Sequence, residues 1–159
     1  MTNTNRSIHL RFTVAIVAAA LCLPAVFGGA LHAQTAPVTV RDAWVREPAA
    51  SRKTTAAFLV IENAGTTKRA IVSASSDAAE TVELHEMVRD GAMMKMSPVK
   101  TIDVPANGKT ELKPGGLHIM MFGLKKQPVA GDTLRITLTL DDGTKTIVAA
   151  PVRKMEGMK

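Results

Sequence analysis

Apolar and polar side chains alternate with a period of two through short segments of this chain, each rich in Val, Ile, Thr or Leu. Eight such segments span residues 38–45, 55–61, 70–74, 81–88, 93–99, 118–124, 133–140 and 145–152. Turn residues such as Asn63-Ala64-Gly65 and Asp90-Gly91 separate them. Alternation of this kind indicates strands, because successive side chains of a strand point to opposite faces. The sequence therefore predicts an all-β fold, an antiparallel sandwich or barrel of about eight short strands.

The first 33 residues have the order of regions that is typical of a secretory signal peptide. Arg6 and Arg11 precede an apolar run of about 16 residues, and the small residue Ala33 ends the segment. A retained membrane anchor is the rival interpretation. The run is shorter than the roughly 18–20 residues that span a bilayer, and Pro24 interrupts it. We expect cleavage after Ala33, with residues 28–30 as a second possible position.

Cleavage there leaves residues 34–159 as a single domain in the periplasm, with no stable membrane insertion. Cys22 is the only cysteine of the chain. A lipidated cysteine would follow a small residue at the end of the apolar run, whereas Leu21 precedes this one and apolar residues follow it. We interpret Cys22 as part of the signal, and the domain that remains has no disulfide framework.

Charge and aromatic content exclude one large class of partners. The full chain carries a formal net charge of +6, its Lys and Arg residues are scattered, and aromatic residues make up 3% of the sequence. Scattered charge favours a solvated surface over a nucleic-acid interface, and few aromatic rings are present for stacking on bases. We expect no binding to nucleic acid.

Histidine and methionine are concentrated in the same two segments. His85 and His118 are the only histidines after residue 33. The methionines around them are Met87, Met93, Met94, Met96, Met120 and Met121. Any one of these methionines could fill a gap in the core. Core filling explains the shared location less well, because a buried imidazole without a polar partner is costly.

Strand alternation places these side chains on common faces. A two-residue turn at Asp90-Gly91, or a four-residue loop with the same register, pairs His85 with Met96 and Met87 with Met94 on one face of a hairpin. In the segment 118–124, the same alternation puts His118, Met120 and Phe122 together.

Ligand chemistry then selects the metal. Thioethers suit Cu(I) and bind hard cations poorly, and structural zinc sites use Cys and His. A blue-copper centre needs a Cys thiolate, which the domain lacks. A set of two His and two Met therefore predicts one Cu(I) ion per chain.

The spacing of these residues resembles the motif of the periplasmic copper chaperones called PCu(A)C. Ten residues separate His85 from Met96, twenty-one separate Met96 from His118, and one separates His118 from Met120. Further likeness lies in Asp42-Ala43-Trp44, Val82-Glu83-Leu84-His85-Glu86, Lys113-Pro114-Gly115-Gly116 and Gly131-Asp132.

The resemblance implies a cupredoxin-like β-barrel in which His85, Met96, His118 and Met120 bind Cu(I). It also implies that the protein supplies copper toward the CuA centre of cytochrome c oxidase, with oxidase assembly components as acceptors. Met87, Met94, Met121 and Phe122 are candidates for a shell around the ligands. Some members add a His- and Met-rich tail for a second copper, whereas the tail here has only Met155 and Met158.

Two alternatives stay open beside a copper chaperone. One is copper sequestration for tolerance, which uses the same chemistry. The other is a metal-free Ig-like domain that binds a protein partner, in which case His85 and His118 would lie far apart. An enzyme is not expected, because the domain has no Cys nucleophile, no Ser in a nucleophile elbow and no recognisable carboxylate pair.

Overall fold

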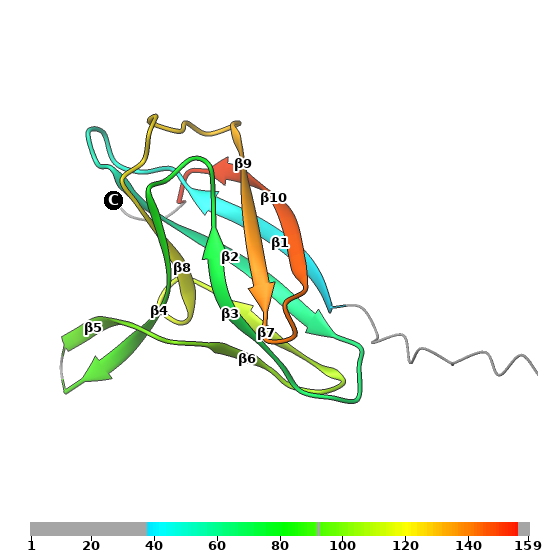
Figure 1. Ribbon diagram of the computed structural model, residues 1–159. Helices are drawn as coiled ribbons and strands as arrows, with labels where there is room; N and C mark the ends of the chain where they lie inside the picture. The colour runs from blue at the N-terminus through cyan, green and yellow to red at the C-terminus, as the bar shows by residue number, and fades with distance from the viewer. Residues whose placement is uncertain (1–37, 92, 156–159) are drawn as a thin grey trace, which may run out of the picture. The chain divides into compact units, whose positions relative to one another are not determined.

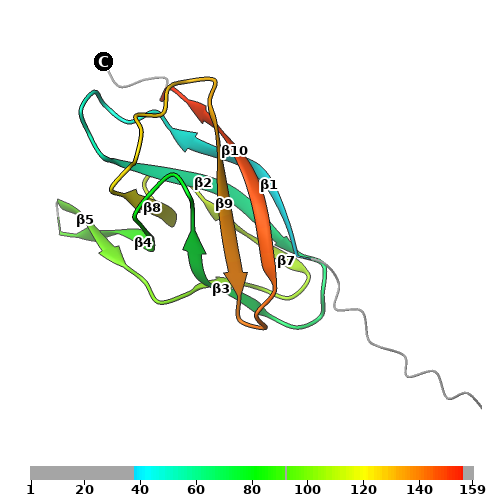
Figure 2. The ribbon, with the colours of Figure 1, turned by 45° about the horizontal axis from the view of Figure 1, so that its top comes forward.

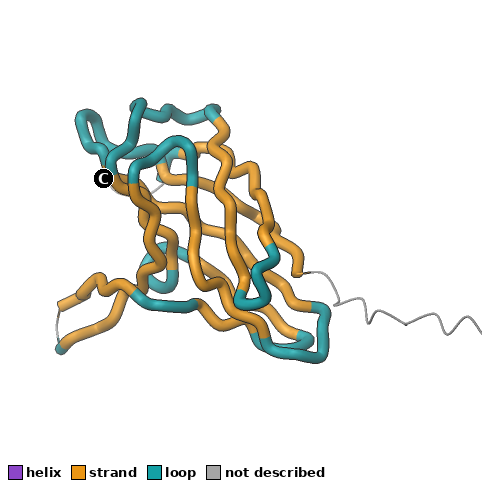
Figure 3. Tube along the Cα trace, in the orientation of Figure 1, coloured by secondary structure: helices purple, strands orange, loops and turns teal. Residues whose placement is uncertain are grey.

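Ten strands and no helix make up the part of the chain that the structure describes (Figures 1 and 3). This computed structural model describes residues 38–91 and 93–155, so the predicted signal segment and Met158 lie outside the described residues. The strands are β1 (Val38–Arg46), β2 (Thr54–Asn63), β3 (Arg69–Ser75), β4 (Thr81–Asp90), β5 (Met93–Pro98), β6 (Ile102–Val104), β7 (Gly108–Leu112), β8 (His118–Phe122), β9 (Thr133–Leu140) and β10 (Lys145–Arg153). Within these ranges, no helix is long and apolar enough to cross a membrane.

The strands are hydrogen-bonded in one open path. Their order is β5-β4-β8-β2-β1-β10-β9-β3-β6, and β7 pairs with the second half of β2. Every pair is antiparallel except β1 and β10, which run parallel through Val45–Val152 and Arg46–Arg153. The strands β1, β10 and β9 lie side by side in both ribbon views (Figures 1 and 2). The prediction of an all-β fold is confirmed, as a mixed sheet that does not close into a barrel.

Two strands were not predicted. The eight predicted segments all form strands, but β6 and β7 lie between the predicted segments 93–99 and 118–124. The Asn107-Gly108 pair in this stretch is typical of a turn. Asn107 does adopt a left-handed conformation, with φ of 48°. Gly108 nevertheless begins β7, which pairs with β2. A strand of three residues such as β6 is too short for alternation to indicate it.

The main core is formed by side chains from both halves of the strand order. Leu59, Ile61 and Ile119 contribute from β2 and β8, and Ile71 and Leu138 contribute from β3 and β9. All five are almost fully buried, and such a side chain contributes about 1.5–3 kcal/mol on burial. This core fixes the face that β2 and β8 turn inward, and the intervening residues must therefore point to the other face of the sheet.

That other face carries a smaller apolar cluster. Ala56 and Phe58 of β2 and Met120 of β8 form it, with Trp44 and Phe122 packed against them. Because β2 and β8 alternate between the two clusters, a residue's position in the strand decides which cluster it joins. Met120 is thereby separated from its neighbours Ile119 and Met121, which belong to the main core.

The hairpin of β4 and β5 has a different register from the predicted one. His85 pairs with Pro98, Met87 with Met96 and Arg89 with Met94, so the predicted pairing of His85 with Met96 is wrong by two residues. Asp90 pairs with Met93, so the loop begins at Gly91. Gly91 has φ of 60°, as the first position of a primed two-residue turn requires.

Pro98 gives a physical reason for this register. The pair that closes a two-residue hairpin loop is hydrogen-bonded, and the pairs then alternate. With Asp90–Met93 as the closing pair, Pro98 occupies a non-hydrogen-bonded position, where its missing N–H is not needed. Consistent with this alternation, the next residue, Val99, donates its N–H to the Leu84 carbonyl oxygen at 2.9 Å. A loop at Asp90-Gly91 would have required Pro98 to donate.

Candidate metal centre

Neighbouring strands bring the two histidines together. His85 of β4 lies directly opposite His118 of β8 in the antiparallel register. Their ring centroids are 5.8 Å apart, and both side chains are buried. Met120 follows His118 by two residues and so shares its face. The two histidines therefore do not lie far apart, as was expected of a metal-free domain.

A carboxylate orients the ring of His85. Glu83 lies two residues earlier on the same face of β4, and its Oε2 is 2.8 Å from His85 Nε2. A neutral imidazole has one N–H and one nitrogen lone pair. Because a carboxylate accepts, Nε2 carries the proton and donates it to Glu83. The lone pair is then on Nδ1, which is buried and has no hydrogen-bond partner among the described residues.

A backbone carbonyl orients the ring of His118 in the same manner. Its Nδ1 donates to the Gly116 carbonyl oxygen at 2.9 Å. The lone pair is then on Nε2, which is also buried and without a partner in the described part of the chain. Burial lowers the pKa of His118 below its usual value of 6.5, against the opposing effect of the Gly116 carbonyl. The ring is therefore held neutral, which is the form that binds a metal.

These two nitrogens are the strongest chemical feature of the face. A buried polar atom without a partner costs about 1–3 kcal/mol. One cation bound between the two rings would satisfy both lone pairs. No group of three or more His, Cys, Asp or Glu side chains suited to a metal occurs within residues 38–91 and 93–155. Further ligands would therefore be thioethers, which favour a soft ion over Zn²⁺, Mg²⁺ or Ca²⁺.

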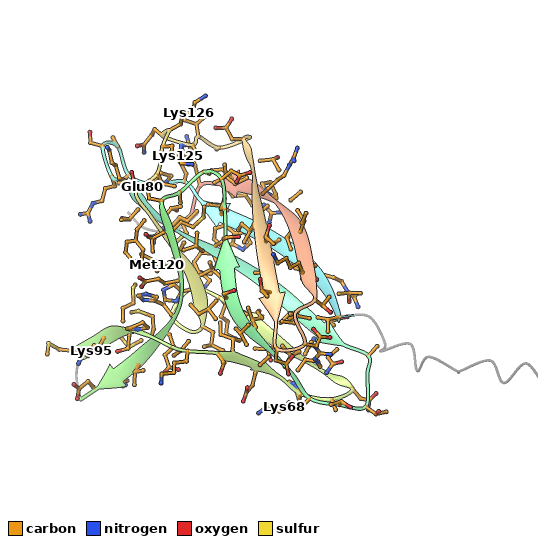
Figure 4. The ribbon with its side chains drawn as sticks, viewed as in Figure 1. Lys68, Glu80, Lys95, Met120, Lys125 and Lys126 are labelled. Carbon is orange, nitrogen blue, oxygen red and sulfur yellow. The ribbon has the colours of Figure 1, made fainter. Side chains whose placement is uncertain are left out.

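Met120 supplies a thioether from an apolar setting. Its side chain is 9% exposed and packs with Ala56 and Phe58 on the face that carries the histidines. Phe122 lies on the same face, with its ring centroid 5.9 Å from that of His85, and the Phe58 ring lies 6.4 Å from that of His118. These rings limit the access of water to the imidazoles. Figure 4 shows Met120 on β8, where this strand runs beside β4.

Met96 is placed differently from the other three predicted ligands. It lies on the edge strand β5, is 45% exposed, and pairs with Met87 rather than with His85. Its side chain is on the face of His85 but in a diagonal position. Diagonal neighbours have Cβ atoms separated by roughly 7–8 Å, which long side chains can bridge. The structure thus groups His85, His118 and Met120 closely and leaves Met96 at the margin.

The predicted outer shell is divided by the structure. Met87 and Met94 lie on the hairpin face that carries His85, and Phe122 lies beside the His85 ring. Met121 does not belong with them. It is fully buried in the main core, because it points to the opposite face from Met120. Adjacency in the sequence was a misleading criterion for this residue.

Sequence reasoning missed the groups that orient the rings. Glu83 was quoted only as part of a motif, although its position two residues before His85 puts it on the same face by simple alternation. The Gly116 carbonyl could not be identified, since the path of a turn backbone is not readable from residue types. Phe58 was missed as well, because its position beside His118 depends on the pairing of β2 with β8.

Comparisons with known proteins agree with this fold. A family model described as "Putative lipoprotein LpqE-like" matches residues 38–152. The "Putative lipoprotein Lxx21020" of Leifsonia xyli subsp. xyli is 39% identical over 121 residues, which are 76% of this chain and 72% of that protein.

Solved structures extend the comparison. The solution structure of CuI-DR1885 from Deinococcus radiodurans is 37% identical, with a TM-score of 0.61, and the match covers 78% of this chain and 83% of that chain. The copper-bound PCuAC domain from PmoF2 is 17% identical, with a TM-score of 0.62, over 74% of this chain and 93% of that domain. The resemblance to PCuAC proteins and the cupredoxin-like fold that it implied are confirmed.

Proposed function

Because this chain belongs to the LpqE-like family, we propose that it is a copper-binding chaperone that holds one Cu(I) ion with His85, His118, Met120 and Met96. The observation that carries the proposal is the pair of buried imidazole nitrogens without partners, His85 Nδ1 and His118 Nε2. The solved relative from Deinococcus radiodurans, 37% identical, is described as a Cu(I) form.

The ligand set suits transfer rather than storage. Two imidazoles and one buried thioether hold the ion from β4 and β8, and the half-exposed Met96 completes the site from the edge strand. Thioethers are neutral ligands, and they form no disulfides in an oxidising compartment. The copper ion is cargo here, and the protein needs only to bind it and to exchange ligands with an acceptor. We therefore propose a carrier without catalytic activity.

The proposed location and acceptor follow from the sequence. The segment 1–33 would direct export to the periplasm, and the acceptor would be an assembly component of the CuA centre of cytochrome c oxidase. Copper sequestration uses the same site, so its separation from delivery needs a cellular test. Deleting the gene should lower oxidase activity at limiting copper if delivery is the role. Increased sensitivity to excess copper, with normal oxidase activity, would instead indicate sequestration.

The binding proposal is tested by titrating the purified protein with Cu(I) under reducing, anaerobic conditions. We expect one equivalent to bind through the histidines. Two-dimensional NMR of the imidazole nitrogens should then show coordination shifts at His85 Nδ1 and His118 Nε2, while Nε2 of His85 and Nδ1 of His118 keep their protons. No uptake of Cu(I), or uptake without a change at these two nitrogens, would contradict the proposed function.

A further inference from the structure

Three methionines of the β4–β5 hairpin share the face of His85. Met87 of β4 lies directly opposite Met96 of β5, and Met94 lies two residues before Met96 in β5. Met94 is 50% exposed, and Met87 is partly buried. By contrast, Met93 is 74% exposed and points to the other face of the hairpin, because it neighbours Met94 in the strand. The predicted register puts the same three methionines on this face, and the observed register changes the direct partner of Met87 from Met94 to Met96.

Packing does not explain these side chains. Methionine is used in cores because it fills irregular gaps, but Met94 and Met96 have about half of their surface exposed to solvent. The exposed face of an edge hairpin would ordinarily carry polar side chains. Three thioethers on such a face therefore need another reason for being there.

The spacing allows the three sulfur atoms to converge. The pair Met87–Met96 occupies a non-hydrogen-bonded position, at which facing side chains approach closely, with Cβ atoms about 4.5–5.5 Å apart. Met94 is one further step along the same face, roughly 7 Å from Met96 along the strand. Methionine is unbranched and has three rotatable bonds, so all three sulfur atoms can reach a common point.

We propose that Met87, Met94 and Met96 form a second Cu(I) site, made only of thioethers and open to solvent, from which the ion passes to the histidine site. This inference rests on the proposed function. Three neutral, soft ligands select a soft monovalent ion. Arg89 lies opposite Met94 on this face, and its positive charge disfavours divalent cations there. A thioether site of this kind binds Cu(I) weakly, and weak binding is needed if the ion is to pass on to the histidine site.

Met96 is the residue that the two sites share. It neighbours Met87 directly and His85 diagonally, so its sulfur can stay bound while the other ligands change. In the handover, the bonds from copper to the sulfur atoms of Met94 and Met87 break. Bonds to His85 Nδ1, His118 Nε2 and the Met120 sulfur form. Copper remains Cu(I) throughout, and no proton moves, because both imidazole nitrogens already carry lone pairs.

The thioether site is tested by itself in a double variant, His85→Leu with His118→Leu, which keeps apolar volume at both positions and removes the nitrogen ligands. The probe is Ag(I), a soft monovalent ion that stays in one oxidation state, and the readout is the NMR shift of the methionine methyl groups. We expect the methyl groups of Met87, Met94 and Met96 to shift together. A further Met94→Leu change should weaken Ag(I) binding about tenfold, whereas Met93→Leu should leave it unchanged.

A kinetic measurement on the otherwise unaltered protein guards against a double variant that fails to fold. Cu(I) uptake from a chelator complex is followed by stopped flow. Met87→Leu and Met94→Leu should each slow uptake several-fold without reducing the final occupancy, and Met93→Leu should not slow it.

Equal uptake rates in all three variants, or methyl shifts no larger at Met94 than at Met93, would overturn the thioether site. If the unaltered protein binds Cu(I) through the histidines, but Ag(I) leaves the Met87 and Met94 methyl groups of the double variant unchanged and the Met87→Leu and Met94→Leu variants take up Cu(I) at the unaltered rate, only this inference fails. If Ag(I) shifts the hairpin methyl groups but Cu(I) never reaches the histidines, the proposed function fails and the thioether site stands.

Discussion

The side chains of Met120 and Met121 are adjacent in the sequence and have opposite surroundings. Met120 lies among the aromatic rings on the face of the histidines, and Met121 is fully buried in the main core. This contrast provides a matched pair of variants, because Leu preserves apolar volume and removes the sulfur at either position. A change of this type costs less than about 1.5 kcal/mol of folding stability.

We expect Met120→Leu to weaken Cu(I) binding strongly and Met121→Leu to leave it unchanged, although both lower the free energy of unfolding slightly. Competition with a Cu(I) chelator measures affinity, and urea unfolding measures stability. Equal Cu(I) affinity in the two variants would mean that Met120 is a packing residue.

At the proposed copper site, Glu83 would act only through His85. Its carboxylate accepts the proton of Nε2 and thereby keeps the lone pair on Nδ1. Removing such a partner of a metal-binding histidine typically costs about 10- to 100-fold in affinity. We expect Glu83→Ala to weaken Cu(I) binding to this extent and to allow the proton of His85 to occupy either nitrogen, as NMR of the ring would show. Glu86→Ala, which alters the opposite face of β4, is the control and should change neither quantity.

At the scale of elements, the β4–β5 hairpin depends on one glycine. Gly91 has φ of 60°, and an added Cβ would meet no atom within 4 Å. Any penalty for a side chain there is therefore backbone strain and not a clash. We expect Gly91→Ala to destabilise the hairpin by about 1 kcal/mol, and Gly91→Asn by less, because Asn tolerates this conformation. Hydrogen exchange of the β5 amides would report the change, and equal protection in both variants would contradict it.

Alternation predicted the strands well and the hairpin register poorly, for one physical reason. A side chain's face follows from counting by two, and so the sharing of a face by His85, Met87, Met94 and Met96 was predicted correctly. The register depends on which residue of Asp90-Gly91 begins the loop. Asp-Gly is a strong turn signal whether the loop begins at Asp90 or at Gly91. Only the missing N–H of Pro98 distinguishes these two registers. The short strands β6 and β7 gave no comparable signal.

The sequence nominates the residues of the candidate site but not their arrangement in space. The two histidines stood out because they are the only ones in the domain and lie among methionines. Their proximity depends on β4 pairing with β8, across more than thirty residues of chain, which no local pattern specifies. The roles of Glu83 and of the Gly116 carbonyl depend in turn on ring orientations that only the structure provides.

At the scale of the whole molecule, an ion cluster between β3 and the turn that follows β9 contributes to the response to acid. Arg69 of β3 is buried, and its Nε donates to Asp141 at 2.8 Å. Its guanidinium also pairs with Asp142. The hydrogen bonds from Arg69 hold the pKa values of both carboxyl groups below their usual value of 3.8.

A lowered pKa in the folded state means that the unfolded chain takes up protons first as the pH falls. The stability from this cluster is therefore complete above about pH 5 and is lost as the pH falls through 3.8 and below. We expect Arg69→Met to lower the free energy of unfolding at neutral pH and to flatten its dependence on pH between about 5 and 2. Lys68→Met, which removes an exposed pair with Asp103, should leave that dependence unchanged. Denaturant unfolding at several pH values would measure both.

The composition of the edge strand β5 affects how this protein resists aggregation. A strand with one free edge and exposed apolar side chains is a template on which a second chain can pair and aggregate. Here Pro98 gives no N–H to an incoming strand, and the charge of Lys95, which Figure 4 shows on the hairpin, must be desolvated before another strand can pack there. The strand β5 can thus expose methionine sulfur atoms to a metal ion, while Pro98 and Lys95 oppose edge-to-edge pairing with a second copy of the chain.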